Sequence, residues 1–519
     1  MKMKQYIILG ILVFLLGSCD SFLKEYSQDL AYAETVTDLE EVLIGNGYLN
    51  RSTGFSWVHM MDDDLEEAVV SSNYTNYENF FIWASYPCMR NNTVYKDETW
   101  VTMYKNISAI NVVLSKLKDI SDLPEEVERL QGECHFLRGF YYFFLVNTYA
   151  KPYVKESAST DLGVPLKTTE YIEDIYFKRN TVAETYSLIK TDLETAARLL
   201  KGKKHQSVFQ ADYNAVQALL SRVYLYLGEY EAALQAADSV LLGDYTLLDY
   251  NEFPQVVATP ADQYGINDIT PVSVLDPSFT ETIFTQGTGA FAGNKQYLGI
   301  ANGSKLSQVN WYKASKELVQ IFDKEAVGGT DLRPMFFMYV QQKDPSNKHY
   351  IQKQTTASET TASSEFLLRL PEILLNKAEA LAMLDRGEEA MAVLEELRVK
   401  RVVAAEYKPL DVRNGEKLVE LIRDERRREL CGEGQRWFDL RRYAVHPKYP
   451  FTKEIIHDHY FYDSSIRQVT YVGSYKLDKY ETEPAYVIPI PQHVIEFNKG
   501  NMVDNETRPD RKAFIRFVG

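Results

Sequence analysis

The chain has 519 residues, and its 73 acidic side chains outnumber its 57 basic ones, which gives a net charge of −16. An apolar content of 45% allows a large buried core. The negative charge argues against a nucleic-acid-binding protein, because its field repels a polyanion. The four cysteines follow no spacing typical of a disulfide framework or a zinc site.

The N-terminus has the pattern of an export signal. The basic start "MKMK" is followed by an apolar run over residues 7–16, which is too short to cross a bilayer as a helix. The string "LGSC" that ends at Cys19 resembles a bacterial lipobox, in which the cysteine is acylated. We therefore predict a signal peptide over residues 1–18 and a lipid anchor at Cys19 with a tether over residues 19–38. The alternative is an ordinary signal peptide with a cysteine near its cleavage site.

If Cys19 is acylated, three cysteines remain for pairing within the folded chain. They are Cys88, Cys134 and Cys431, and an odd number leaves at least one thiol free. The sequence does not decide whether Cys88 and Cys134 form a disulfide bond.

Residues 51–96 follow a short helix that we expect over residues 39–44, and they show little periodicity. They contain glycine, serine and asparagine, several aromatic residues, and three consecutive acids at 62–64. Adjacent charges on a loop are usually hydrated, because burying a charge is costly. We therefore predict that these acids are exposed to solvent.

From residue 97 the apolar side chains recur at spacings of three and four, which is the period of a helix. We predict four helix pairs, over residues 97–149, 181–242, 366–402 and 416–443. A proline at 124 favours the start of the second helix of the first pair. Residues 211–242 resemble a tetratricopeptide unit with a Leu-Gly turn at 227–228, and residues 366–402 repeat its spacing. The spacing is irregular along the whole chain, which argues against a long open solenoid.

Two long insertions interrupt these helices, at residues 250–312 and 444–482. Both are too long for simple connections, and their aromatic residues argue against disorder. In the second insertion, a strand over residues 457–459 would place His457 and His459 on one side, as in a metal site. No third ligand is evident, so we predict a solvated loop there.

The segment "RDERRRELCGEGQRWFDLRRY" (423–443) is rich in arginine. Arginine interleaved with aromatic residues is typical of nucleic-acid-binding surfaces. However, five acids lie in the same segment, several of them three or four residues from an arginine, where helical neighbours can pair. We therefore predict internal ion pairs that include Arg436 and Asp439, and an arginine stacked on Trp437.

Several strings together resemble the SusD/RagB family, which are surface glycan-binding lipoproteins of Bacteroidetes. The core from Glu433 to Arg442, with the pattern Glu-Gly-x-Arg-Trp-x-Asp-Leu-x-Arg, is the most specific of them. The resemblance runs in order over nearly the whole chain. The other strings are "RGFYYFFLVNTYAKPY" (138–153), "KASKELVQIFDKEAVGGTDLRPMFF" (313–337), "RLPEILLNKAEAL" (369–381) and "IPIPQHVIEFNKGNM" (488–502).

The resemblance implies a mainly α fold: one SusD-like domain over residues 39–519, in which tetratricopeptide-like helix pairs form a right-handed superhelical scaffold. It also implies a non-enzymatic outer-membrane protein, without a cofactor, that faces the cell exterior and delivers glycan to a SusC-like TonB-dependent β-barrel. Peptide capture is the alternative within the family. A lipoprotein glycoside hydrolase, which would need two opposed carboxylates, and a scaffold that binds only proteins are the alternatives outside it.

By family position, residues 51–96 and the two insertions would carry the ligand surface. Aromatic faces suit the C–H side of sugar rings, and Asn or Asp side chains suit the hydroxyls. For each aromatic residue, ordinary packing is the alternative. The candidates are Asp63, Asn73, Tyr74, Tyr77 and Trp83 in the first segment, and Tyr264, Phe291, Asn294, Tyr297 and Trp311 in the second, with Trp83 and Trp311 foremost.

Overall fold

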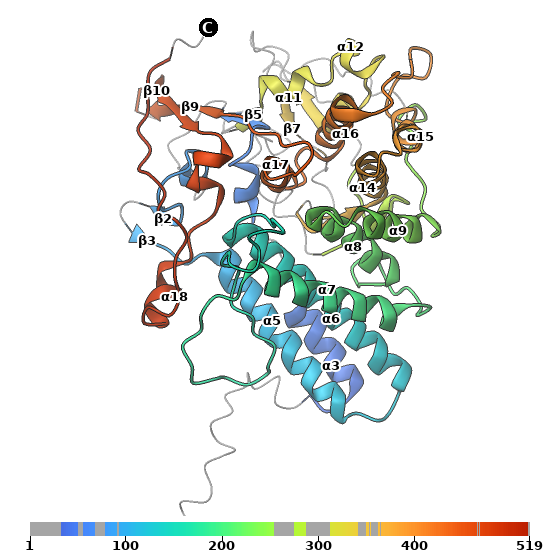
Figure 1. Cartoon of the computed structure of the whole chain (residues 1–519), viewed down its shortest axis with the longest axis vertical. Helices are drawn as coiled ribbons and strands as arrows, with labels where there is room; N and C mark the ends of the chain where they lie inside the picture. The colour runs from blue at the N-terminus through green and yellow to red at the C-terminus, as the bar shows by residue number, and fades with distance from the viewer. Residues whose placement is uncertain are drawn as a thin grey trace, which may run out of the picture.

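The computed structural model is mainly helical, as predicted from the sequence (Figure 1). Cys19 and the expected signal peptide lie outside the residues that it describes. The described residues are 33–49, 55–67, 78–90, 93–253, 274–286, 312–340, 349–351, 353, 362–363, 365–463, 465–466 and 468–516.

The first helices form a side-by-side stack in the lower half of Figure 1. An added Cβ at Gly132 of α6 would lie 2.6 Å from Leu200 Cγ of α7, so only a glycine allows this close approach. Asp97 and Thr181 cap α5 and α7 by accepting hydrogen bonds from backbone N–H groups. The stack comprises α3 (Val36–Val42), η1 (Leu43–Gly47), α5 (Glu98–Lys116) with η3 (Leu117–Asp119), α6 (Pro124–Tyr149) and α7 (Val182–Leu200).

Three further helix pairs continue the scaffold toward the C-terminal half. The turn between α8 and α9 contains Gly228 in the left-handed conformation (φ 71°), which a glycine adopts without strain. These pairs confirm the predicted tetratricopeptide-like units and the last pair, but residues 181–242 form three helices, α7, α8 and α9, and not the single pair that we predicted. They are α8 (Tyr213–Leu227) with α9 (Tyr230–Leu241), α14 (Leu370–Met383) with α15 (Gly387–Arg398), and α16 (Gly415–Leu430) with α17 (Arg436–Ala444).

The strands of the described residues form five separate antiparallel pairs. These pairs are β1 (Leu65–Glu67) with β5 (Tyr312–Ala314), β2 (Met89–Arg90) with β3 (Thr93–Val94), β4 (Thr282–Thr285) with β8 (Leu367–Arg369), β6 (Met338–Val340) with β7 (His349–Ile351), and β9 (Ile455–Asp463) with β10 (Gln468–Leu477). The remaining short helices are η2 (Ser56–His59), α4 (Glu78–Phe81), α11 (Lys316–Gln320), α12 (Lys324–Val327), α13 (Arg333–Phe337), η4 (Tyr480–Thr482), η5 (Pro484–Tyr486) and α18 (Gln492–Phe497).

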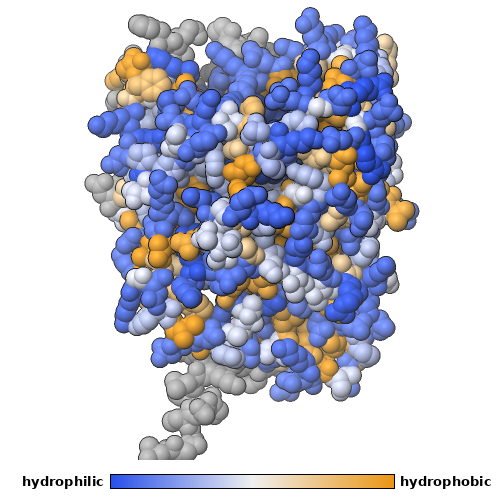
Figure 2. All heavy atoms as spheres, viewed as in Figure 1, coloured by the Kyte–Doolittle hydropathy of each residue, from blue (hydrophilic) through white to orange (hydrophobic). Residues whose placement is uncertain are grey.

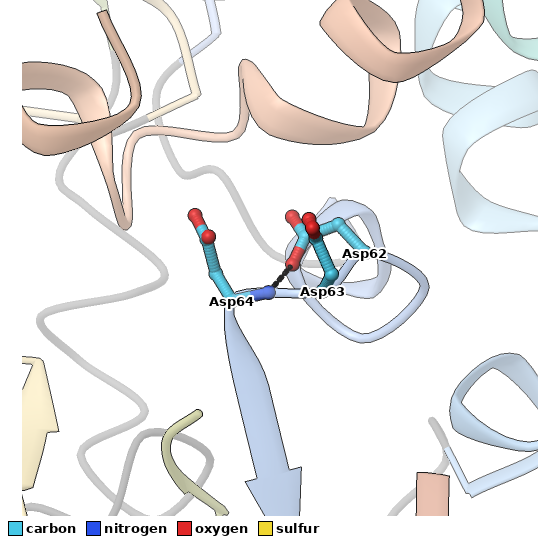
Figure 3. Close-up of side chains that lie close together, drawn as sticks. All are labelled: Asp62, Asp63 and Asp64. Atoms are coloured by element: carbon cyan, nitrogen blue, oxygen red, sulfur yellow. Dashed lines mark hydrogen bonds between the residues drawn. The ribbon is translucent and has the colours of Figure 1, made fainter. Parts of the chain in front are cut away.

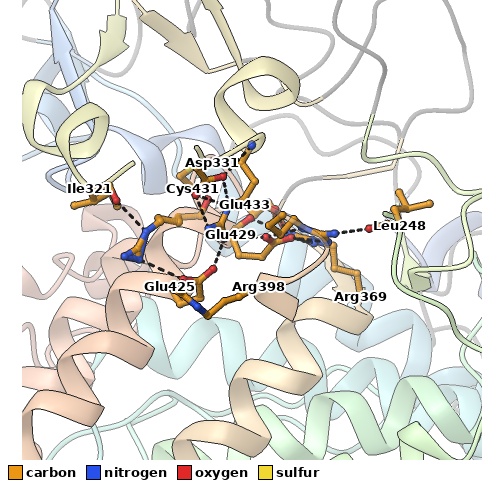
Figure 4. A network of polar contacts seen from close by, with 12 residues as sticks. Leu248, Ile321, Asp331, Arg369, Arg398, Glu425, Glu429, Cys431 and Glu433 are labelled. Carbon is orange, nitrogen blue, oxygen red and sulfur yellow. Dashed lines mark hydrogen bonds and ion pairs between the residues drawn. The ribbon is translucent and has the colours of Figure 1, made fainter. Parts of the chain in front are cut away.

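The arginine-rich segment lies inside the protein, at a buried ion-pair network that we call the arginine junction (Figure 4). Glu429 accepts from Arg369 at 2.7 Å and from Arg401 at 3.1 Å, and both arginines are almost fully buried. This confirms the predicted internal pairing and removes the segment from any nucleic-acid-binding surface. The junction consists of Glu281, Asp331, Arg333, Lys353, Arg369, Arg398, Arg401, Glu425, Glu429 and Glu433.

The predicted stacking of an arginine on Trp437 is wrong. The indole stacks on Tyr486 instead, with ring centroids 5.0 Å apart and planes 9° from parallel. Arg423 and Arg442 lie over the ring of Tyr443, at 4.1 and 4.4 Å. The predicted partners Arg436 and Asp439 do pair internally, with Asp63 and Arg426 respectively.

The described cysteines, Cys88, Cys134 and Cys431, are free and buried. Among the described residues, no helix is long and apolar enough to cross a membrane. The face drawn in Figure 2 is mostly hydrophilic, with apolar side chains in separate groups.

Candidate ligand-binding region

The three segments expected to carry the ligand surface meet at one group of strands. Strand β1, from residues 51–96, pairs with β5 at the end of the first insertion. Strand β9, from the second insertion, packs against β1 and pairs with β10. We call β1, β5, β9 and β10 the strand platform, which lies at the top of Figure 1.

The three acids before β1 are buried, so the prediction that they are solvated is wrong (Figure 3). Asp63 accepts from Arg436 at 2.7 Å and from Lys453 at 2.8 Å, and Arg427 pairs with Asp64 at 2.7 Å. Three basic side chains therefore balance most of the charge of this acidic turn. They fix the start of β1 against α16 and α17.

The pKa values of the acidic turn follow from this pairing. Burial would raise the pKa of Asp63, but Arg427 and Arg436 hold it well below its usual range. Burial, together with the neighbouring Asp64 and Asp63, raises the pKa of Asp62 well above its usual range. Carboxylate oxygens of the three acids lie within 4.8 Å of one another. Because basic groups already occupy Asp63 and Asp64, we assign no metal to this cluster.

Trp83 and Asp63 do not present a surface to a ligand, which corrects the expectation for both. Trp83 is 0% exposed and has a left-handed backbone (φ 51°). Its indole N–H donates to the carbonyl of Met61 at 2.9 Å, and its ring stacks on His457 at 4.2 Å. Trp83 therefore packs the acidic turn and the second insertion together.

His457 and His459 lie on strand β9 and are buried, so the predicted solvated loop is also wrong. The imidazole of His459 lies between two carboxylates, Glu67 at 2.9 Å and Glu78 at 3.3 Å. Burial lowers the pKa of His459, but these two acids outweigh it and raise the pKa to about 10. A cationic His459 thus links the two described ends of segment 68–77.

The outward face of the hairpin carries polar and aromatic side chains that sequence reasoning missed. The rings of Tyr460 and Tyr471 are cross-strand neighbours with centroids 5.5 Å apart. Beside them, Arg516 donates to both carboxylate oxygens of Asp458, at 2.8 and 2.6 Å. The signal was the alternation in "IIHDHYFYD", in which every second residue from Ile455 to His459 is buried. The half-exposed tyrosine rings can pack on the C–H face of a sugar, and the neighbouring ion pair can form hydrogen bonds with its hydroxyls.

The remaining candidates lie outside the described residues. Segment 68–77 is bounded by Glu67 and Glu78, and residue 312, the first of β5, follows Trp311 directly. These candidates are therefore adjacent in sequence to the strand platform, and their roles stay predictions. They are Asn73, Tyr74, Tyr77, Tyr264, Phe291, Asn294, Tyr297 and Trp311.

Known proteins are similar to this chain over most of its length. Residues 228–507 match the family model described as "SusD family", and residues 22–225 match the one described as "Starch-binding associating with outer membrane". Two SusD-like proteins of Formosa agariphila are each 24% identical to this chain. The alignments extend over 388 and 378 residues and cover 66% of this chain and 71% and 70% of those proteins.

Solved structures are similar along almost the whole chain. A SusD superfamily protein from Bacteroides thetaiotaomicron has a TM-score of 0.66 at 22% identity, and the match covers 91% of this chain and 100% of that one. A SusD-like carbohydrate binding protein from Bacteroides vulgatus has a TM-score of 0.65 at 20% identity, covering 90% and 97%. At these identities the likeness establishes the fold.

Proposed function

The chain belongs to the SusD family, and we propose that it is a non-enzymatic cell-surface lipoprotein that captures glycan for a SusC-like TonB-dependent transporter. The observation that carries the proposal is the match to the SusD family model over residues 228–507. The export signal and the cysteine at position 19 support a lipid anchor in the outer membrane. Delivery to the transporter is the inferred second step.

The strand platform supports a ligand surface on this side of the protein. Tyr460, Tyr471 and Arg516 offer ring faces and hydrogen-bond donors. The expected contacts Trp311, Asn294 and Tyr297 belong to the segment that ends at β5, and Asn73, Tyr74 and Tyr77 to the segment between β1 and α4. Stacking aromatics with few convergent polar groups are what an oligosaccharide site requires.

Two alternatives make different predictions. A peptide-capturing lipoprotein of the same family would use the same platform, and only a ligand panel separates it from glycan capture. A glycoside hydrolase needs one carboxyl with a raised pKa and a second one across an open cleft. The most conspicuous acids, Asp62 to Asp64, are buried under basic side chains and are not arranged in this way.

The first test is calorimetry on the mature chain with a panel of plant, host and microbial oligosaccharides and a mixed peptide pool. We expect a saccharide to bind, and Trp311→Ala or Tyr471→Ala to weaken binding about tenfold or more, the loss of one stacking contact or hydrogen bond. Phe497→Ala is the matched control, because this exposed ring on α18 lies outside the platform. Binding of peptides without saccharides would contradict glycan capture, as would hydrolysis that depends on one carboxylate.

The anchor needs a separate test, because ligand binding does not depend on it. We expect Cys19→Ala to move the protein from the membrane fraction to the soluble one and to abolish labelling with a palmitate analogue. Co-purification with a β-barrel transporter from the native membrane is the corresponding test of the partner. Unchanged membrane labelling in Cys19→Ala would contradict the lipid anchor.

A further inference from the structure

A small cavity lies on the helical scaffold, apart from the strand platform. It has a volume of about 220 Å³ and forms where residues 152–156, the α8–α9 turn and the end of α17 meet. At roughly 30 Å³ per water molecule, this is space for about seven waters. That volume is below the range of drug-sized ligands and fits a single ring.

Three tyrosines, Tyr153, Tyr226 and Tyr230, are among the residues that line this cavity. Tyr153 and Tyr226 both contribute, and their rings are held from behind by Tyr186 at 5.3 Å and Phe143 at 5.0 Å. Within the described part of the chain, neither hydroxyl takes part in a hydrogen bond, although Tyr226 is only 9% exposed. A hydroxyl in such a place lacks a partner unless a ligand or water supplies one.

A third tyrosine hydroxyl is oriented by a histidine. His446 Nδ1 accepts from the backbone N–H groups of Lys448 at 3.2 Å and Tyr449 at 2.9 Å. Burial, together with the charge of Arg423, lowers the pKa of His446 to about 4, so the ring is neutral and its single proton is on Nε2. Nε2–H therefore donates to the hydroxyl oxygen of Tyr230, 2.8 Å away. The hydroxyl proton of Tyr230 is left free to donate elsewhere.

The charges around the cavity do not select an ion. Arg442 lines it, but this guanidinium already pairs with Glu379 through two bonds and with Asp439 at 2.8 Å. Lys155 and Glu156 at the edge are exposed and opposite in sign. Because Arg442 is already paired, and because Lys155 and Glu156 offer opposite charges in contact with water, a charged ligand would gain little and would lose its hydration.

An aromatic side chain from a partner protein is a poor occupant as well. It would fill the apolar part of the lining but leave the hydroxyls of Tyr153, Tyr226 and Tyr230 without acceptors, which costs free energy for each buried group. A polyhydroxylated ring meets both requirements, because its C–H face packs on tyrosine and its oxygens accept from the three hydroxyls.

We propose that this scaffold cavity is a second binding site, which takes one uncharged, pyranose-sized sugar residue, either free or at the end of a longer glycan. The proposal rests on the cavity that contains these tyrosines. It does not depend on whether the strand platform binds a ligand.

The test uses the mature, acylated protein in detergent and four probes: the methyl glycosides of glucose, galactose, mannose and xylose. We expect saturation-transfer NMR to detect at least one of them with millimolar affinity, as befits a ligand of this size. Tyr226→Phe and Tyr153→Phe each remove only a hydroxyl, and each should weaken binding roughly five- to tenfold. Unchanged urea midpoints would show that both variants are folded.

Tyr171→Phe is the matched control, because this exposed tyrosine lines neither the cavity nor the strand platform, and it should bind the probe as the wild type does. Longer oligosaccharides that end in the same sugar show whether a chain end also enters the cavity. The proposal is overturned if no probe binds, or if the phenylalanine variants bind as tightly as the wild type. It is also overturned if binding of the probe is lost only in Tyr471→Phe, a variant of the strand platform, or if N-acetyl-tyrosinamide binds in place of every sugar.

Discussion

The lower helix stack and the arginine junction are both buried, but different forces hold them. In the stack, α6 and α7 come so close that a Cβ on Gly132 would overlap Leu200, and apolar contacts surround a buried ion pair between Arg138 and Asp192. In the junction, Glu425 and Glu429 on α16 accept from arginines in α13 and β8, at the end of α15 and just after it. Apolar packing accepts small changes of shape, whereas each buried charge needs its own partner in place.

The difference matters because of what each region joins. The stack links helices that follow one another in the chain. The junction joins Glu281, Arg333 and Lys353, which belong to short described segments on either side of the chain's irregular stretches. Because each buried charge of the junction needs its own partner, the junction holds these described segments in one arrangement. The proposed ligand surface extends from them.

The largest expected effect comes from removing one charge at the centre of the junction. Glu429→Gln removes one of the buried carboxylates that pair with each of Arg369 and Arg401, which keep Glu433 and Glu281 respectively. We therefore expect a loss of about 3–5 kcal/mol in the free energy of unfolding, measured with urea. Glu389→Gln is the control, because its pair with Arg386 is exposed and should contribute nearly nothing. A loss below about 1 kcal/mol for Glu429→Gln would mean that buried charge pairs do not hold the junction, and so would contradict the proposed difference from the helix stack.

The next effect depends on pH. Burial would raise the pKa of Glu379, but the charge of Arg442 and its hydrogen bonds lower it to about 2, against about 4.3 in an unfolded chain. A lowered pKa stabilises the fold above the unfolded value and ceases to do so as pH falls through the folded one. Glu379→Gln should therefore cost roughly 3 kcal/mol at pH 7, and the difference from wild type should shrink between about pH 5 and pH 2. A difference independent of pH would contradict this pairing.

In the helix stack, the expected effect is smaller and steric. Gly132→Ala should destabilise the protein by about 1–3 kcal/mol, because the new methyl group meets Leu200, and the loss should not vary with pH. Gly45→Ala is the matched control, since nothing lies within 4 Å of its added Cβ, and a neutral or slightly stabilising result is expected. Equal losses in both variants would show that close packing is not the cause.

The smallest expected effect is a difference in cysteine labelling, which shows whether the arginine junction or the helix stack opens first. Burial raises the pKa of the Cys431 thiol in the junction to about 12, and that of Cys134 in the stack well above its usual range. Neither thiol should react with a maleimide in native buffer. In Glu429→Gln at low urea, mass spectrometry should find Cys431 labelled before Cys134. Simultaneous labelling would mean that both regions open as one unit.

The helix pairs could be predicted because their signals are local. Apolar spacing, the proline at 124 and the Leu-Gly turn at 228 each act within a few residues of where they stand. The internal pairing of Asp439 with Arg442 could be predicted for the same reason, since the two lie three residues apart on one helix.

The site residues could not be predicted in this way, because exposure is decided by distant partners. The sequence marks Trp83 as a surface aromatic, but in the structure its ring stacks on His457. It marks Asp63 as hydrated, but in the structure this carboxylate pairs with Arg436 and Lys453. The many arginines near Trp437 in sequence favour stacking of an arginine on its ring, but in the structure the ring of Tyr486, distant in sequence, stacks on it. The β9–β10 hairpin is a different error, because a local signal was present. The alternation of buried and half-buried residues in β9 indicates a strand, whereas we predicted a loop there.

The order of residues in the arginine junction also bears on how the chain is made. The guanidinium groups of Arg333, Arg369 and Arg401 leave the ribosome before the carboxylates of α16 that neutralise them. Until α16 emerges, Asp331 and Glu281 are the carboxylates available to these arginines, so closing this half of the protein would bury more positive than negative charge. A chain cut short before residue 424 should therefore be incompletely folded and sensitive to proteases, because closure of this half needs residues from nearly the last fifth of the chain.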